Sequence, residues 1–212
     1  MKSKNIIILG ILAFLATIVF YSLTGSESPE DYTQTILKER EEKDVFMKSD
    51  SGSPFLSNKD SAQTTIDFKG LNYFAPDLKF KVTANLVSIE NKKVVVLPTS
   101  DGKEKKYLEY AFAEFKLEGK ENKLVILEIM DAGPYRGTLF LAFADATSAN
   151  ETYGAGRYID LKKAPGASTM ILDFNKAYNP YCAYSDNFSC PFPPKENILT
   201  IAINAGEKKY HD

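Results

Sequence analysis

Beyond Thr64, the apolar residues of this 212-residue chain recur at every second position, which is the period of a β-strand with one buried face. Segments rich in Gly, Asn, Asp and charged residues separate the apolar runs at spacings typical of hairpins. No amphipathic helical pattern lies between them. We therefore predict a mainly β domain, an antiparallel sandwich or barrel-like meander of eight to nine strands. The predicted strands include 64–69, 80–86, 94–97, 107–117, 124–130, 138–143, 157–161 and 169–175.

A second constraint is the apolar run at residues 6–26. These 21 residues carry no charge, and as a helix they would be about 31 Å long, which matches the hydrocarbon core of a bilayer. Lysines precede the run and acidic residues follow it, so the positive-inside rule keeps the N-terminus in the cytoplasm. We expect a single-pass protein of the inner membrane whose domain lies in the periplasm or another extracytoplasmic space. The alternative is a signal segment that is cleaved before secretion, although residues 23–25 are a poor cleavage site.

The membrane anchor or signal segment is assigned to residues 1–26, a charged helix and linker to 27–52, and the β domain to 53–212. Ser28 is a suitable N-cap and Pro29 a suitable first helical residue, so we expect one α-helix from there to about Met47. Its middle is charged on every face, which is typical of a surface helix or a stalk. The apolar residues of its last turn are expected to contact the domain.

Composition limits the classes of function. Hydrophobic residues make up 44% and charged residues 25% of the chain, as in an ordinary globular domain. The formal net charge of −2 leaves no basic surplus to neutralise phosphates, so we expect no nucleic-acid partner. His211 is the only histidine, and a Ser-His-Asp triad would therefore need its base in the C-terminal tail. We expect no metal and no cofactor.

The strands predicted at 157–161 and 169–175 are interpreted as a hairpin. In the register we favour, Arg157 lies opposite Asp173, while the apolar residues share the other face. Arg157 is then either an anion-binding group oriented by Asp173 or one half of a structural ion pair. The preceding Gly154-Ala155-Gly156 lacks the third glycine and the following helix of a dinucleotide site, which leaves a tight turn or a small backbone anion nest.

Cys182 and Cys190 enclose a short loop rich in turn residues. In an oxidising compartment a disulfide is the expected state of this pair. Free buried thiols are the main alternative. Metal or redox chemistry has less support, because the spacing is not C-x-x-C and a zinc site would need two further ligands.

Three segments carry a resemblance to a known family: 70–74 (GLNYF), 152–158 (TYGAGRY) and 172–180 (LDFNKAYNP). The cysteines, the proline-rich residues 190–194 and the segment 205–208 extend it, so that it covers roughly residues 44–208. On these residues the chain resembles domain-of-unknown-function family 1684, an uncharacterised bacterial family. The resemblance implies no reaction and no ligand.

We expect a ligand-binding or protein-interaction domain of the cell envelope, whose partners are the membrane and an unknown envelope ligand or protein. The alternative is a hydrolase acting on an envelope polymer or a small ester or glycoside. No local pattern selects a pair among the carboxylates available for it, which are Glu109, Glu128, Asp131, Asp145 and Asp160. A purely structural role, with the loop around the cysteines as a docking surface, is the third possibility. The candidate ligand-binding residues are Arg157, Asp173, Asn175, Tyr178 and Asn179.

Overall fold

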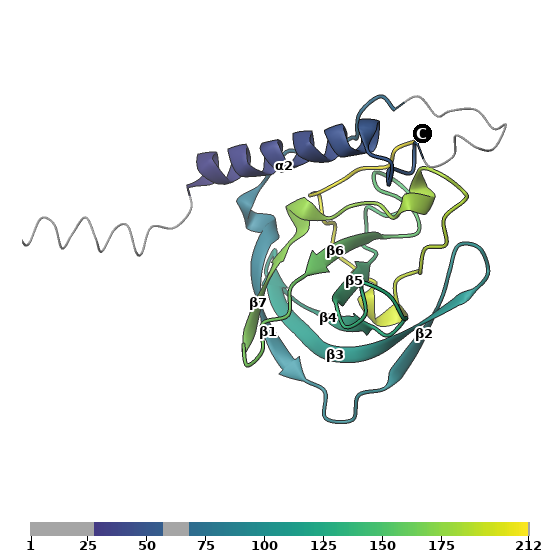
Figure 1. Cartoon of the computed structure of the whole chain (residues 1–212). Helices are drawn as coiled ribbons and strands as arrows, with labels where there is room; N and C mark the ends of the chain where they lie inside the picture. Colours follow the sequence, from purple (N-terminus) through teal and green to yellow (C-terminus); the bar gives the residue numbers. More distant parts are fainter. Residues whose placement is uncertain (1–27, 57–67, 212) are drawn as a thin grey trace, which may run out of the picture. The chain divides into compact units, whose positions relative to one another are not determined.

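The computed structural model describes residues 28–56 and 68–211, and the compact domain considered below begins at Thr33. Within these ranges the chain forms one α-helix, seven strands and four short 3-10 helices (Figure 1). The elements in chain order are α2 (Pro29–Ser49), η1 (Leu78–Phe80), β1 (Lys81–Ser88), β2 (Val94–Pro98), β3 (Glu104–Leu117), β4 (Lys120–Ile129), β5 (Leu139–Phe143), β6 (Arg157–Leu161), β7 (Thr169–Asp173), η2 (Phe174–Lys176), η3 (Tyr181–Ala183) and η4 (Lys195–Asn197).

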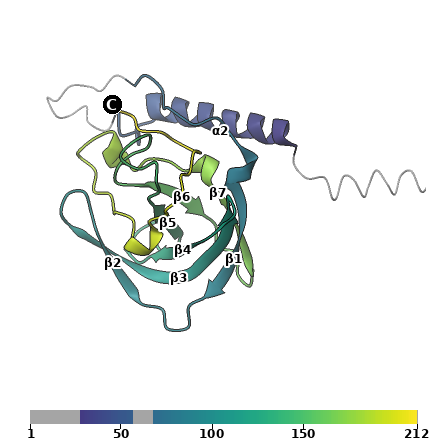
Figure 2. The same ribbon diagram turned by 180° about the vertical axis from the view of Figure 1, so that it is seen from behind.

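The seven strands form one antiparallel sheet, in which six follow the order β6-β5-β4-β3-β1-β7 and β2 pairs with β3 off this path. The long strand β3 pairs with β2 through its first half and with β1 through its second half. The sheet curves into a half-barrel, which is visible from both sides in Figures 1 and 2. The predicted mainly β, antiparallel fold is confirmed. The prediction left open a sandwich or a barrel-like meander of eight to nine strands, and the described residues form a single half-barrel sheet of seven strands. The predicted strand number is too high for the described residues, because the C-terminal segment contacts the sheet through isolated bridges rather than as strands.

The hairpin between β3 and β4 shows how local sequence sets the register. Leu117 pairs with Lys120, which leaves Glu118 and Gly119 as the two residues of the turn. Both have positive φ, 50° and 79°. A two-residue turn of this kind matches the twist of the flanking strands, and glycine adopts it without strain. The hairpin spacing predicted between the strands at 107–117 and 124–130 is confirmed.

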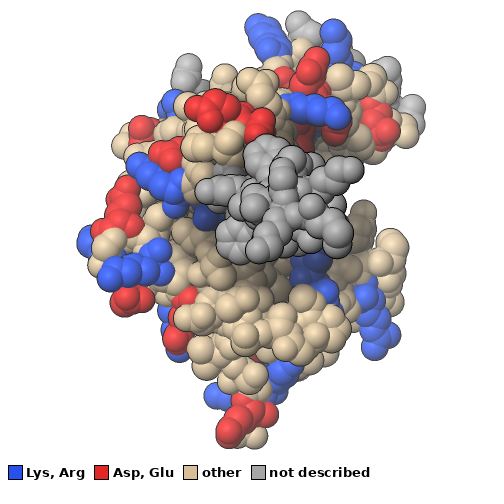
Figure 3. Space-filling view, turned by 90° about the vertical axis from the view of Figure 1, so that its left-hand side faces the viewer, with Lys and Arg blue, Asp and Glu red and all other residues tan. Residues whose placement is uncertain are grey.

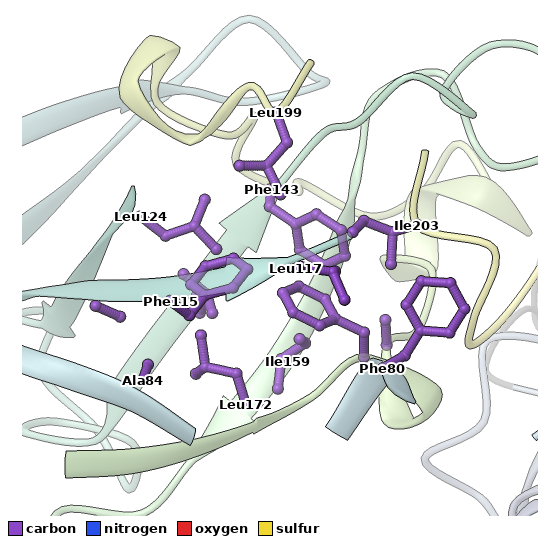
Figure 4. Packing of buried hydrophobic residues seen from close by; sticks show 14 of the residues in the cluster. Phe80, Ala84, Phe115, Leu117, Leu124, Phe143, Ile159, Leu172, Leu199 and Ile203 are labelled. Atoms are coloured by element: carbon purple, nitrogen blue, oxygen red, sulfur yellow. The ribbon is translucent and has the colours of Figure 1, made fainter. Parts of the chain in front are cut away.

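The main hydrophobic core lies between the curved sheet and the C-terminal segment of the chain. Figure 4 shows side chains from several strands converging on one another and on Leu199 and Ile203. Phe80 and Ala84, predicted to share a buried face, are 1% and 0% exposed. The alternation read from the sequence therefore identifies the buried face of β1 correctly.

The pairing predicted for β6 and β7 is wrong. β6 pairs with β5, so that Arg157 lies opposite Phe143, and β7 pairs with β1, so that Asp173 lies opposite Lys81. The two strands occupy the two ends of the sheet order, and residues 162–168 connect them. Alternation identifies the faces of a strand but not its partner, and this explains the error.

Asn197 joins β4 and β5 where the two strands separate. Their pairing ends after Leu127 and Phe140, and the Asn197 side chain supplies the missing hydrogen bonds. Its Oδ1 accepts from the Val125 N–H at 2.7 Å, and its Nδ2 donates to the Val125 carbonyl at 2.9 Å and to the Ala142 carbonyl at 2.8 Å. The side chain is fully buried, so this one amide satisfies three main-chain groups that water cannot reach.

Helix α2 begins as predicted. The Ser28 Oγ accepts a hydrogen bond from the Asp31 N–H at 3.1 Å, which satisfies a free donor of the first turn. The charged middle of helix α2 contacts the domain more than predicted. Arg40 donates to the main-chain carbonyls of Phe74 and Asn175, so the helix is fixed to the domain and is not a free stalk.

In the last turn of α2 only Met47 is buried, at 1% exposed, whereas Val45 is 60% exposed. None of the described helices is both long and apolar enough to span a bilayer. The predicted anchor at residues 6–26 and the first residues of the strand predicted at 64–69 lie outside the described ranges.

Replacing Asn197 by Ala should lower the free energy of unfolding by about 3 kcal/mol, because it leaves three buried main-chain groups without a partner. Urea denaturation measures this change. The control is Asn122→Ala, which removes one exposed hydrogen bond to the Lys120 carbonyl and should cost less than about 1 kcal/mol. Equal losses in the two variants would contradict the role assigned to Asn197.

Candidate functional site: an aromatic cleft

A cleft of about 710 Å³ lies between helix α2, the face of β3 to β6 that carries Tyr107 and Phe140, and the segment around the two cysteines. This volume falls within the usual range for small-molecule sites, roughly 300–1,000 Å³. The lining includes six of the chain's 12 tyrosines: Tyr73, Tyr107, Tyr135, Tyr158, Tyr178 and Tyr181.

Four aromatic rings form a continuous wall of the cleft. The Tyr107 and Phe140 rings are stacked, with centroids 5.1 Å apart and planes at 18°. Phe140 meets Tyr158 edge to face at 4.8 Å, and Tyr158 meets Tyr178 in the same way at 5.9 Å. Each contact has the geometry that aromatic quadrupoles favour, so the rings hold one another in place.

The hydroxyls of this wall are fixed as well. Tyr158 donates to the Pro191 carbonyl at 2.6 Å, and Tyr178 donates to the Asp160 carboxylate at 2.8 Å. Burial raises the pKa of both tyrosines, and the nearby Asp160 raises that of Tyr178 further. Both phenols therefore remain neutral donors at physiological pH.

Main-chain pairing places Tyr178 at the cleft. The Tyr158 N–H donates to the Tyr178 carbonyl at 2.8 Å, and the Tyr178 N–H donates back to the Tyr158 carbonyl at 3.0 Å. This single bridge joins the segment after η2 to the middle of β6. It follows that the residues just after η2 form one side of the cleft.

Charged side chains surround the rings. The lining contains four basic residues (Arg40, Lys43, Lys105 and Lys176) and two acidic ones (Glu39 and Asp160). Lys176 pairs with Glu39 at 2.6 Å, with both side chains nearly half exposed. Elsewhere on the surface, Figure 3 shows acidic and basic side chains interspersed over the face that it presents.

Beneath the cleft, Arg157 forms a buried ionic cluster. Its Nη2 donates to the Asp145 carboxylate at 2.8 Å, and neither side chain is more than 1% exposed. The remaining guanidinium contacts are the carbonyls of Ala205, Glu207 and Ile203. The acidic partner of Arg157 is thus Asp145, and the predicted pair with Asp173 is not formed. This arginine holds the C-terminal segment to β6.

Glu207 extends the cluster towards helix α2. Its carboxylate accepts from Lys43 Nζ at 3.1 Å, from Asn179 Nδ2 at 2.8 Å and from the Tyr184 hydroxyl. Glu207 is 0% exposed. A buried carboxylate is tolerated only when it is paired and hydrogen-bonded, and here α2 supplies the charge that pairs it.

The structure divides the predicted ligand-binding residues into two groups. Asn175 and Tyr178 line the cleft. Arg157 and Asn179 lie in the buried cluster, and the Asp173 carboxylate accepts from the Asn175 N–H at 3.1 Å to begin η2. Ligand binding by any of them stays a prediction, but only the first two face a space that a ligand can enter.

Four of the five carboxylates considered for hydrolysis contact other kinds of group, and the fifth, Asp131, is exposed. Glu109 accepts from the Lys93 N–H, and Glu128 pairs with Lys163. Asp145 and Asp160 are bound to Arg157 and Tyr178 as described above. Among the described residues, no group of three or more His, Cys, Asp or Glu side chains could hold a metal ion.

The predicted disulfide is absent, because Cys182 and Cys190 are free thiols. They are nevertheless neighbours: the Cys182 N–H donates to the Cys190 Sγ at 3.2 Å, and the Tyr153 hydroxyl lies 3.8 Å from the Cys182 Sγ. A hydrogen bond from Cys190 lowers the pKa of Cys182 to about 6, helped by Tyr153 and opposed by burial. The same bond, together with burial, raises the pKa of Cys190.

The glycine pair before β6 has a structural explanation. Gly156 has a φ of 85°, and a Cβ at this position would lie 2.6 Å from the Phe143 carbonyl oxygen and 2.6 Å from Pro193 Cγ. Glycine is required by this close approach. Gly154 has no positive φ. The tight-turn interpretation therefore accounts for Gly156.

A model of the family described as Protein of unknown function (DUF1684) matches residues 66–208, which is more than half of the chain. The chain belongs to this family. The DUF1684 domain is also similar to an uncharacterized protein from gene locus rrnAC0354 of Haloarcula marismortui, known from a solution NMR structure. The two are 37% identical with a TM-score of 0.61, over 84% of this chain and 95% of that chain. No curated protein matches the chain.

The family resemblance predicted from three segments is thus confirmed. Sequence reasoning missed several residues on which the cleft depends, namely Arg40, Lys43, Lys105, Tyr107, Phe140 and Glu207. It considered Asp145 only as a carboxylate for hydrolysis and not as the partner of Arg157. One signal was available for Glu207, because it follows Gly206 within the 205–208 family segment, and a glycine there indicates a constrained turn. In the structure Gly206 has a φ of 75° and lies against the Ala177 and Phe174 carbonyls.

Because its pKa is about 6, Cys182 should be alkylated by iodoacetamide with a rate that reaches half its maximum near pH 6. Cys190 should not react at that pH. Peptide mass spectrometry distinguishes the two thiols. Cys190→Ala removes the hydrogen bond that stabilises the Cys182 thiolate and should move the midpoint towards the ordinary value of about 8.5. An unchanged midpoint in this variant would contradict the account.

Proposed function

We propose that this domain is a small-molecule binding module whose site is the aromatic cleft. The observation that carries the proposal is the continuous wall of rings from Tyr107 to Tyr178 beside an open space of about 710 Å³. Hydrogen bonds and ring contacts fix these side chains without any ligand. A site arranged in advance binds with a smaller loss of conformational entropy.

The lining combines apolar and polar groups in the manner of ligand sites. Rings and aliphatic side chains cover most of it, and a few donors and charges give it direction. Hydrolysis has weaker support, because Glu109, Glu128, Asp145 and Asp160 are bound to other groups rather than paired as acid and base. Ligand binding without catalysis requires no such pair of carboxylates.

We further propose that the module acts in the cell envelope, outside the cytoplasmic membrane. The support is the uncharged run at residues 6–26 with lysines before it and acidic residues after it. Separation of membrane, periplasmic and cytoplasmic fractions tests this placement, and recovery of the full-length chain from the cytoplasmic fraction would contradict it.

Binding is tested with a neutral aryl probe, N-phenyl-1-naphthylamine. The chain contains no Trp, and half of its tyrosines line the cleft, so bound probe should quench tyrosine emission in a saturable manner. Phe140→Leu removes one ring of the wall and should weaken binding about fivefold, the equivalent of one aromatic contact of about 1 kcal/mol.

Phe112→Leu is the matched control. Phe112 is also a half-buried ring of the sheet, but it lies next to Lys123 and not in the cleft. This variant should bind the probe with unchanged affinity. Equal weakening in the two variants, or quenching that never saturates, would remove the proposed site.

A further inference from the structure

The charges of the cleft do not balance. Four basic and two acidic side chains line it; Lys176 pairs with Glu39 at 2.6 Å, and Lys43 pairs with Glu207, a buried acid outside the lining, at 3.1 Å, so that four positive charges meet three negative ones. The other acid, Asp160, accepts a hydrogen bond from Tyr178. The lining therefore has a surplus of positive charge beside an aromatic wall.

Lys105 supplies part of that surplus. Its Nζ donates to the Ser189 carbonyl at 3.2 Å, next to Cys190, and no carboxylate of the described residues pairs with it. The side chain is half-buried. An ammonium group that is partly removed from water and bound to one neutral carbonyl is well placed to take an anionic partner.

A second donor points to the same class of ligand. The Tyr73 hydroxyl is buried and makes no hydrogen bond with the described residues, although Tyr73 lines the cleft. Burial, and then the nearby Glu207 and Asp44, raise the pKa of Tyr73, so its proton is retained. Unsatisfied buried donors are costly, and an oxygen acceptor on a ligand would remove that cost.

The cleft does not favour a cationic ligand, because cations of the protein already lie over two of its rings. Aromatic sites that bind ammonium groups leave the ring faces open to them. Here Lys43 Nζ already lies 4.7 Å from the centroid of the Tyr178 ring, and the Arg40 guanidinium lies 4.4 Å from that of Tyr73. A positively charged ligand would meet like charges at both places.

We propose that the cleft selects a flat aromatic or apolar molecule carrying one oxyanion, with its body on the wall from Tyr107 to Tyr178 and its anion at Lys105. This inference rests on the proposed function, because it names the ligand class of the same site. A carboxylate, sulfonate or phosphate ester has the required chemistry. The aromatic body of the ligand supplies contact area, and its oxyanion fixes its orientation in the cleft.

The test compares two probes that share an aryl scaffold, titrated into the full chain and followed by tyrosine emission. N-phenyl-1-naphthylamine is neutral, and 8-anilinonaphthalene-1-sulfonate adds one sulfonate. The anionic probe should bind about tenfold more tightly or better at low salt, and this preference should shrink as salt is added.

Lys105→Gln should lower the affinity for the anionic probe about tenfold more than the affinity for the neutral probe, and saturable binding of the neutral probe shows that the variant is folded. The control is Lys106→Gln: Lys106 is exposed on the opposite face of β3, and its loss should change neither affinity.

The outcomes separate the two proposals. Equal affinities for the two probes, or a preference that survives Lys105→Gln, would overturn the oxyanion site while leaving the aromatic cleft intact. Failure of both probes to saturate would remove the proposed function itself.

Discussion

The buried guanidinium of Arg157 is the constraint on which the rest of the domain depends. A charge at this depth is costly unless it is paired and hydrogen-bonded. The two Nη groups of Arg157 bind the Asp145 carboxylate and carbonyls of the C-terminal segment, whereas its Nε has no hydrogen-bond partner among the described residues. The last part of the chain therefore has to follow the sheet closely. Since this segment also completes the hydrophobic core through residues such as Leu199 and Ile203, apolar packing and charge satisfaction require the same arrangement.

Glu207 links the buried Arg157 cluster to the cleft. Its main-chain carbonyl binds Arg157, while its carboxylate binds Lys43 of helix α2 and Asn179 of the segment after η2. Two sides of the cleft are thus attached to one buried residue, and the third is the rigid face of the sheet. This explains how an open cleft persists beside a charged helix. It also explains why Lys43 of that helix, with a side chain 27% exposed, faces the domain, whereas Lys38 and Glu42 of the same helix remain exposed to water.

Local signals in the sequence were sufficient to predict where strands and turns lie, but not which strands pair with each other. The positive φ at Glu118 and Gly119 and the cap at Ser28 follow from residue types within a few positions, so both were predictable. Pairing of β6 with β5 depends on which apolar faces meet across the sheet, and alternation carries no information on that. The cleft was harder still, because it is formed by residues far apart in the chain: Lys105, for example, donates to the Ser189 carbonyl, 84 positions away. Asn175 and Tyr178 were identified because a polar cluster follows a strand, a pattern that is local.

Hydrogen exchange of helix α2 tests most directly whether buried charge holds the cleft together. In Glu207→Gln, the loss of the charge that pairs Lys43 should speed exchange of the α2 amides from residue 36 to residue 47 by about tenfold, while β3 and β4 stay protected. Glu39→Gln, which removes only a half-exposed pair with Lys176 on the same helix, should leave α2 unchanged. Equal protection of α2 in the Glu207 variant and the unaltered chain would contradict the account.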